Sequence, residues 1–312
     1  MHIRGLYLGK THSKYASSLH QLAILAMNES YLEKSKDYFE KSLEIKLKVF
    51  GYNHPSTATT LNLLGNLFDE LGNVNLAFEN KKKALEIRQE ILGENHPDFA
   101  VSLTHFANSL HKMGNLQTAV EFLKKAITIL TKNYGNYHRN LISPYFSLID
   151  VYLDQENYQE AIDMMEILTK INSDNYGENH IQTSLIYNQT GRIFFETNKV
   201  SESLALFNKA LKIQQGLYDN HDHACMINTH SLIGHCLKKM GEYKSALISL
   251  EKVLFLTKKF KGDKGIEGCK ILYAISEIYL EMEKEAEYKV NLKNTFKLAT
   301  EFIVRNSKGK AS

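Results

Sequence analysis

The sequence predicts an all-α protein, a solenoid of about seven helix pairs stacked so that each pair contacts its neighbours. A histidine recurs at a nearly constant interval through the 312 residues, and the apolar residues between these histidines follow helical spacing. The chain contains only three Pro, a residue that interrupts helices. A hydrophobic share of 43% supplies a core, and a charged share of 23% excludes wholesale disorder.

The repeat interval is 42 residues. It separates His12, His54, His96, His138 and His180, and His223 follows after 43 residues with Gly265 in the same position 42 later. The sequence flanking the histidine repeats too, since residues 51–55 and 93–97 are both Gly-x-Asn-His-Pro. We therefore expect one repeat array over residues 1–304, with units starting near 12, 54, 96, 138, 180, 223 and 265. A polar tail is expected over residues 305–312.

Each unit is expected to hold two helices, as the unit that starts at His96 illustrates. Its first apolar stripe contains Leu103, Phe106, Ala107 and Leu110, and its second contains Ala119, Phe122, Leu123, Ala126 and Leu130. Gly114 interrupts the pattern between the stripes, and Gly135 ends the second helix, because Gly adopts the left-handed conformation of a helix end at little cost.

The starts of the first helices are marked by proline. Pro55 and Pro97 are placed at first helical positions, where a missing amide hydrogen is no loss. Pro144 comes about five positions later in its own unit, which predicts a shortened first helix capped by Ser143. In the last unit Gly265 and Ile266 replace His-Pro, and Tyr288 replaces the usual Ala, as terminal repeats often diverge.

Small residues mark the places where helices approach closely. One position of the first helix holds Ala23, Gly65, Ala107, Gly191 and Gly234, and one position of the second helix holds Ala77, Ala119, Ala161 and Ala246. This pattern of a large residue, Leu-Gly/Ala, an aromatic residue and Ala-x3-Phe-x2-Ala resembles the tetratricopeptide repeat. The 42-residue period resembles the variety found in kinesin light chains and nephrocystin-3, best seen over residues 92–100 and 126–129. The resemblance implies a right-handed superhelix whose first helices line a concave groove.

The resemblance places the groove at positions 8, 12 and 15 residues after the recurring histidine. The candidate residues there are Asn62, Asn66, Asp69, Thr104, Asn108, His111, Phe146, Asp150, Asn188, Arg192, Phe195, Ser231, His235 and Lys238. Asn can pair with the backbone of an extended peptide because its side chain both donates and accepts. The phenylalanines suit apolar anchors, and the cations suit acidic residues of a ligand. The alternative is a solvated, unused face.

Other polar residues favour structural roles. The recurring histidines lie about one repeat apart and cannot share a site, so we interpret them as turn residues that pack between units. Cys225 and Cys236 are eleven residues apart, roughly 16 Å along a helix, which is too far to share an ion. Lys81–Lys83 with Lys124 and Lys125 are expected on the outer surface, with an anionic partner as the alternative. The sequence predicts no catalytic residue, cofactor or metal.

The function expected is that of a non-enzymatic scaffold or adaptor that binds a peptide segment or helix of a partner in its groove. Nucleic acid is not expected, because the net charge is only +3 and five of the 38 basic residues are Arg. No apolar run is long enough to span a membrane, and no signal peptide is visible. We expect a cytoplasmic setting, with a cytoskeletal or ciliary one as its variant. The alternatives are a structural subunit of such an assembly and a regulatory domain of a larger protein.

Overall fold

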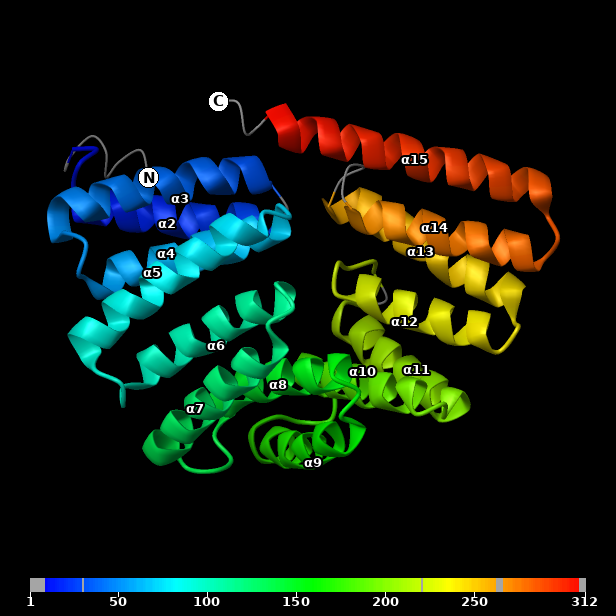
Figure 1. The fold of residues 1–312 in the computed structure, drawn as a ribbon, viewed down its shortest axis with the longest axis horizontal. Coiled ribbons are helices and arrows are strands. Elements are labelled where there is room, and N and C mark those ends of the chain that lie inside the picture. Colours follow the sequence, from blue (N-terminus) through cyan, green and yellow to red (C-terminus); the bar gives the residue numbers. More distant parts are fainter. Residues whose placement is uncertain (1–8, 30, 220, 262–265, 309–312) are drawn as a thin grey trace. The chain divides into compact units, whose positions relative to one another are not determined.

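A computed structural model describes residues 9–29, 31–219, 221–261 and 266–308 (Figure 1). These residues form fourteen α-helices and one short 3-10 helix, and none of them lies in a strand. The predicted all-α solenoid class is therefore confirmed. The start of the seventh unit, near 265, lies outside the described residues.

The chain divides into two compact units between Asn175 and Tyr176. The first unit contains α2 (Ser13–Asn28), α3 (Leu32–Phe50), α4 (Pro55–Glu70), α5 (Val74–Leu92), α6 (Pro97–Lys112), α7 (Leu116–Tyr134), the 3-10 helix η1 (Arg139–Leu141), α8 (Ile142–Asp154) and α9 (Tyr158–Asn175). The second contains α10 (Ile181–Glu196), α11 (Val200–Leu217), α12 (Met226–Lys239), α13 (Tyr243–Lys261), α14 (Ile266–Glu281) and α15 (Glu285–Lys308). Helix α15 runs past residue 305, where the polar tail was expected, and residues 309–312 are not described.

Consecutive helices form seven pairs, from α2 with α3 to α14 with α15. Within each unit the second helix of one pair packs against the first helix of the next, for example α5 on α6 and α11 on α12. Figure 1 shows these helices lying side by side within each unit. Every pair therefore obtains part of its core from its neighbours, as expected of a repeat array.

The recurring histidine is the N-cap of α2, α4, α6, α10 and the 3-10 helix η1, and in the sixth unit it lies two residues before Cys225, the N-cap of α12. Its Nδ1 accepts a hydrogen bond of 3.1–3.2 Å from the backbone N–H two residues on, at His12, His54, His96, His138, His180 and His223. At four units the ring also stacks on an aromatic residue at the end of the previous repeat, in the pairs Phe50–His54, Tyr134–His138, Tyr176–His180 and Tyr218–His223. The histidine thus caps one helix and packs against the preceding one, in agreement with the expected turn role.

The prediction at Pro144 is half right. Helix α8 has 13 residues where α4, α6 and α10 have 16, so the shortened helix is confirmed. Ser143, however, lies inside the first turn and is not the cap, which is Leu141 without a side-chain hydrogen bond. The physical reason is that His138 caps the 3-10 turn η1, and the chain passes directly from η1 into α8. Pro144 falls in the first turn, where no intrahelical acceptor needs its amide.

The small residues of the first helices make room for large side chains of their partner helices. A Cβ placed on Gly191 would lie 2.4 Å from the Phe207 ring, and one on Gly234 would lie 2.8 Å from Leu250. Phe207 and Leu250 are fully buried and belong to the core of the second unit. Glycine at these positions therefore allows a large core side chain to cross directly over the helix backbone.

Candidate peptide-binding site

Three of the predicted groove residues are buried, and two of them hold neighbouring pairs together. Asn62 is 4% exposed and donates to Ser102 Oγ at 3.0 Å, and Asn188 donates to Thr229 Oγ1 at 2.8 Å. Thr104, also buried, donates to the carbonyl of Ala100 in its own helix. The position 8 residues after the histidine therefore faces the next repeat at Asn62 and Asn188, and at all three residues burial leaves a ligand little access.

Four further candidates pair with other residues of the chain. Asp69 forms an ion pair with Lys81 and lies 3.2 Å from Lys112, and His111 Nε2 lies 2.6 Å from an oxygen of Asp154. Arg192 donates to Gln189, and Lys238 Nζ is 2.7 Å from Glu277. These charges already have partners, so a ligand at these positions would have to share or exchange them.

The other candidates are partly accessible. Asn66, Asn108, Phe146, Asp150, Phe195 and Ser231 are half-buried, and His235 is exposed. Of these, Asn66, Asn108, Phe146 and Asp150 belong to α4, α6 and α8 of the first unit. Phe195, Ser231 and His235 belong to α10 and α12 of the second unit. The structure thus leaves accessible groove candidates in each unit.

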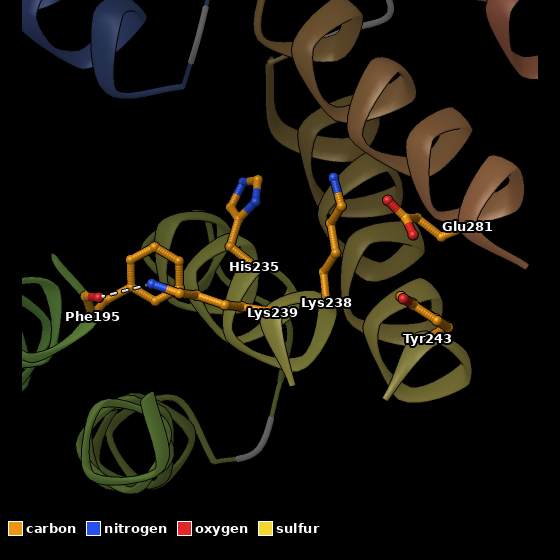
Figure 2. Close-up of a pocket in the computed structure, with 6 residues that line it drawn as sticks. All are labelled: Phe195, His235, Lys238, Lys239, Tyr243 and Glu281. Atoms are coloured by element: carbon orange, nitrogen blue, oxygen red, sulfur yellow. Dashed lines mark hydrogen bonds between the residues drawn. The ribbon is translucent and has the colours of Figure 1, made fainter. Parts of the chain in front are cut away.

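In the second unit three candidates meet at one depression of about 390 Å³. It is lined by Phe195 of α10, His235, Lys238 and Lys239 of α12, Tyr243 of α13 and Glu281 of α14. Figure 2 shows His235 and Lys238 projecting from α12, while Lys239 extends toward Phe195. Four helices of three consecutive pairs therefore contribute to one site, which we call the α12 pocket.

The charges of the α12 pocket are ordered by contacts within the chain. Lys239 Nζ lies 4.5 Å from the centre of the Phe195 ring and donates to the Phe195 carbonyl at 3.3 Å. Desolvation of the His235 ring, followed by the nearby Lys238 charge, lowers the pKa of His235, while Glu277 acts in the opposite direction. A His235 with a lowered pKa is neutral at pH 7, so it can donate one hydrogen bond and accept another.

The arrangement suits an anchor that carries both an apolar and an acidic group. The Phe195 and Tyr243 rings offer apolar surface, and Lys239 offers an ammonium group beside it, while the Lys238 ammonium is shared with Glu277. Charged hydrogen bonds of this kind are stronger than neutral ones. Glu281, which also lines the pocket, and Glu277, which pairs with Lys238, limit the positive charge and favour a ligand with few negative charges.

Sequence reasoning missed three members of the α12 pocket, namely Lys239, Tyr243 and Glu281. Lys239 and Tyr243 flank the turn between α12 and α13. The spacing of 8, 12 and 15 residues after the histidine selects one face of the first helix only, so it does not include these two residues. Glu281 lies in the last pair, to which the groove rule was not extended. Applied there, the same spacing selects Tyr273, Glu277 and Leu280, of which Tyr273 and Leu280 are exposed and Glu277 binds Lys238.

The expected outer-surface position of Lys81 is wrong. Its side chain is 1% exposed, whereas Lys82, Lys83, Lys124 and Lys125 are exposed as expected. The physical reason is Gly65, where a Cβ would lie 2.6 Å from Lys81 Cγ, so the lysine stem crosses the α4 backbone and its ammonium reaches Asp69. Burial lowers the pKa of Lys81, Asp69 raises it, and Lys112 lowers it.

Within residues 9–29, 31–219, 221–261 and 266–308, no three His, Cys, Asp or Glu side chains gather in a way that could hold an ion. No helix in that part of the chain combines the length and apolarity that crossing a bilayer requires.

Comparison with known proteins agrees with this architecture. The tetratricopeptide repeat family matches residues 14–90, 70–132, 98–172 and 141–216, and a second tetratricopeptide repeat family matches residues 227–259. No curated protein matches significantly.

Solved structures with the same fold include relatives of kinesin light chains. A chain of nearly identical TPR-like repeats, described as a kinesin light chain of Podosopora anserina, is 21% identical with a TM-score of 0.53. The match covers 66% of this chain and 98% of that one. BtubC (BKLC) of P. vanneervenii is 18% identical with a TM-score of 0.57, covering 75% of this chain and 94% of its own. Since the repeat family matches well over half of the sequence, this chain belongs to the tetratricopeptide repeat family.

Proposed function

We propose that this protein is a non-enzymatic scaffold that binds a segment of a partner protein along its first helices, with the α12 pocket as the anchor site. The observation that carries the proposal is that Phe195, His235 and Lys238, three of the groove residues predicted from the repeat spacing, line one depression. The tetratricopeptide repeat family, in which helix pairs present extended surfaces, supports the same use.

The chemistry of the α12 pocket defines the partner segment. It carries an acidic side chain for Lys238 or Lys239 and an apolar side chain for the rings of Phe195 and Tyr243. A protein segment fits better than nucleic acid, because the whole chain has a net charge of only +3. A cytoplasmic setting, with a cytoskeletal or ciliary one as its variant, belongs to the same proposal and rests on the likeness to kinesin light chains.

The proposed affinity is modest. A flexible segment loses conformational freedom when it binds, and this loss offsets much of the contact energy. We expect a dissociation constant of about 1 μM for a single segment, which corresponds to roughly −8 kcal/mol. Partners that carry several such segments bind more tightly through effective concentration.

The test is affinity purification with the full chain, comparing the wild type with a pocket variant, Phe195→Ala combined with Lys239→Glu. Partners recovered are quantified by mass spectrometry, and peptides from them are then titrated by fluorescence anisotropy. We expect the pocket variant to lose about tenfold or more in affinity for those peptides, because it removes one anchor surface and reverses one charge.

The matched control is Lys82→Glu combined with Lys83→Glu on α5, since both side chains are exposed and lie outside the α12 pocket. The control should leave recovery unchanged. Loss of partners in the control with full recovery by the pocket variant would instead favour a structural subunit or regulatory domain that uses its outer face. Equal recovery by all three proteins would refute the pocket as the anchor site.

A further inference from the structure

Helix α13 exposes large apolar side chains on the face that points away from its core. Ile248 is 69% exposed and Phe255 is 51% exposed, although both lie in the middle of a helix. The opposite face of α13 contributes Leu250 and Val253 to the core of the second unit. With Lys244, Lys252 and Lys259 at intervening turns, these residues form one line along the helix, the α13 stripe.

The two apolar residues depart from the pattern of the repeat. The position of Ile248 holds Asp37, Glu79, Glu121, Asp163 and Ala205 in the five preceding second helices. The position of Phe255 holds Glu44, Glu86, Thr128, Lys170 and Lys212. All ten of these residues are polar or small, as is usual at positions of a helix that face solvent. Only α13 among these six helices combines two large apolar side chains on this face.

The Phe255 ring is held in place before any partner arrives. Lys252 Nζ lies 5.1 Å and Lys259 Nζ 5.7 Å from the centre of the ring. Asp222 bridges the same two lysines, at 2.7 Å from Lys252 and 3.6 Å from Lys259. A side chain ordered in this way loses little conformational entropy on binding, which is a property of aromatic anchors in protein interfaces.

The charge around the α13 stripe is positive. The three lysines of the stripe, Lys244, Lys252 and Lys259, outnumber the two neighbouring acids, Glu251 and the bridging Asp222. Asp222 offsets one of the two charges that it bridges, so a positive surplus stays beside the apolar residues. Charge complementarity therefore selects an acidic partner.

The spacing of the stripe indicates the shape of that partner. Ile248 and Phe255 are seven residues apart, roughly 10 Å along the helix, which is the heptad repeat of paired helices. The stripe is one helix wide, and α13 is fixed in the core on its other side, so its exposed face has the dimensions that suit a single partner helix. We infer that the α13 stripe is a second interaction surface, which binds an acidic amphipathic helix of a partner protein.

The test is a selection of helical peptides displayed on phage against the full chain, with a stripe variant, Ile248→Glu combined with Phe255→Glu, as the counter-target. The variant restores the residue types found at these positions in other repeats, so its fold should be unchanged by circular dichroism. We expect clones enriched on the wild type to carry apolar residues seven apart, flanked by Asp or Glu. Their affinity should fall by about tenfold or more on the stripe variant.

The matched control is Leu25→Glu on α2, which introduces the same charge at an apolar residue that is 56% exposed. This control should retain binding of the selected clones. If the double variant fails to fold, the single variant Ile248→Glu replaces it as the counter-target. Enrichment of the same clones on wild type and stripe variant would overturn the inference, as would enriched clones that are basic or extended. Binding of phosphatidylserine vesicles that is lost in the stripe variant, without any selected peptide, would assign the surface to lipid.

Discussion

Lys81 shows how one residue can occupy a core position and still carry a charge. The same position of the other second helices holds Phe39, Leu123, Met165, Phe207 and Leu250. The lysine stem fills this apolar position beside Gly65, and the ammonium pairs with Asp69. A buried ion pair depends on both partners, because a single charge left behind keeps its desolvation cost.

Replacing Lys81→Met is expected to lower the free energy of unfolding by about 3 kcal/mol, since Asp69 then stays buried with only the half-exposed Lys112 nearby. Combining Lys81→Met with Asp69→Leu removes both charges and is expected to restore stability to within about 1 kcal/mol of the wild type or above it. Urea unfolding of the three proteins measures both values. A double variant as unstable as the single one would contradict this account.

His20 makes the first unit sensitive to acid. Its pKa is lowered to about 4 from 6.5, mainly by burial and also by the Lys46 charge. It occupies the position of Asn62 and Asn188, and its Nδ1 lies 3.3 Å from Thr60 Oγ1 in the next pair. Because the pKa is lower in the folded state, the unfolded chain binds the proton first. This contribution to stability is therefore complete above pH 6.5 and is lost as the pH falls toward 4.

The variant His20→Asn introduces asparagine, the residue that stands at the equivalent positions 62 and 188. There the asparagine side chain donates a hydrogen bond to a hydroxyl of the next pair. We expect a smaller fall in the free energy of unfolding between pH 6.5 and 4 than in the wild type, measured by urea titration at each pH. A second measurement follows the pKa of His20 by NMR in the variant Lys46→Met. Removal of the Lys46 charge should raise this pKa only part of the way to 6.5, because the ring stays buried. An unchanged pH dependence in His20→Asn would show that His20 contributes nothing to the acid sensitivity and would leave it to His105, whose pKa burial also lowers to about 4.

At the scale of the helix, the recurring histidine combines a cap with an aromatic stack. His54 caps α4 and stacks on Phe50 with ring centres 4.3 Å apart, whereas His96 caps α6 with Leu92 at the corresponding position. Asn is an equally good cap without a ring. His54→Asn should therefore cost about 1 kcal/mol through the lost stack, while His96→Asn should be nearly neutral. Equal losses in thermal or urea unfolding would show that the stack adds nothing.

The turn inside six of the pairs, from α4–α5 to α14–α15, places one residue in the left-handed region. Gly72, Gly114 and Gly241 occupy this position with φ of 75–81°, but Glu156, Asn198 and Glu283 occupy it as well with φ of 58–62°. A residue with a Cβ is disfavoured there by about 1 kcal/mol. Glu156→Gly should raise the free energy of unfolding by up to about 1 kcal/mol. Glu156→Ala, which removes the charge and keeps the Cβ, is the control and should not stabilise the protein.

The helices were more predictable from the sequence than the accessibility of the site. The period, the prolines and the glycines act locally, so they placed the helix pairs correctly. Whether Asn62 is buried depends on Ser102, forty residues away, and such a partner is visible only after the pairs are stacked. Lys81 could have been recognised from its alignment with Phe39 and Leu123, because a polar residue at a core position requires a buried partner.

At the scale of the whole chain, each compact unit has a core of its own. Phe39, Leu64 and Leu67 belong to a cluster in the first unit, and Phe207, Leu250 and Ile275 belong to one in the second. The division between Asn175 and Tyr176 also respects the local hydrogen bonds and stacking. Asn175 donates to the carbonyl of Tyr137 in the first unit, and Tyr176 stacks on His180, the cap of α10, in the second.

Separate expression of residues 1–175 and 176–312 is therefore expected to give two helical proteins that each unfold cooperatively on heating. Each fragment keeps its own clusters and caps, and stability in a repeat array comes from neighbouring pairs. Circular dichroism melts measure this, with a division inside the first unit, after Leu92, as the control. That cut separates α5 from α6, including the bond from Arg88 to Ser102, and should yield a less cooperative fragment. Fragments 1–175 and 176–312 that fold only when mixed would show instead that the chain is one cooperative body.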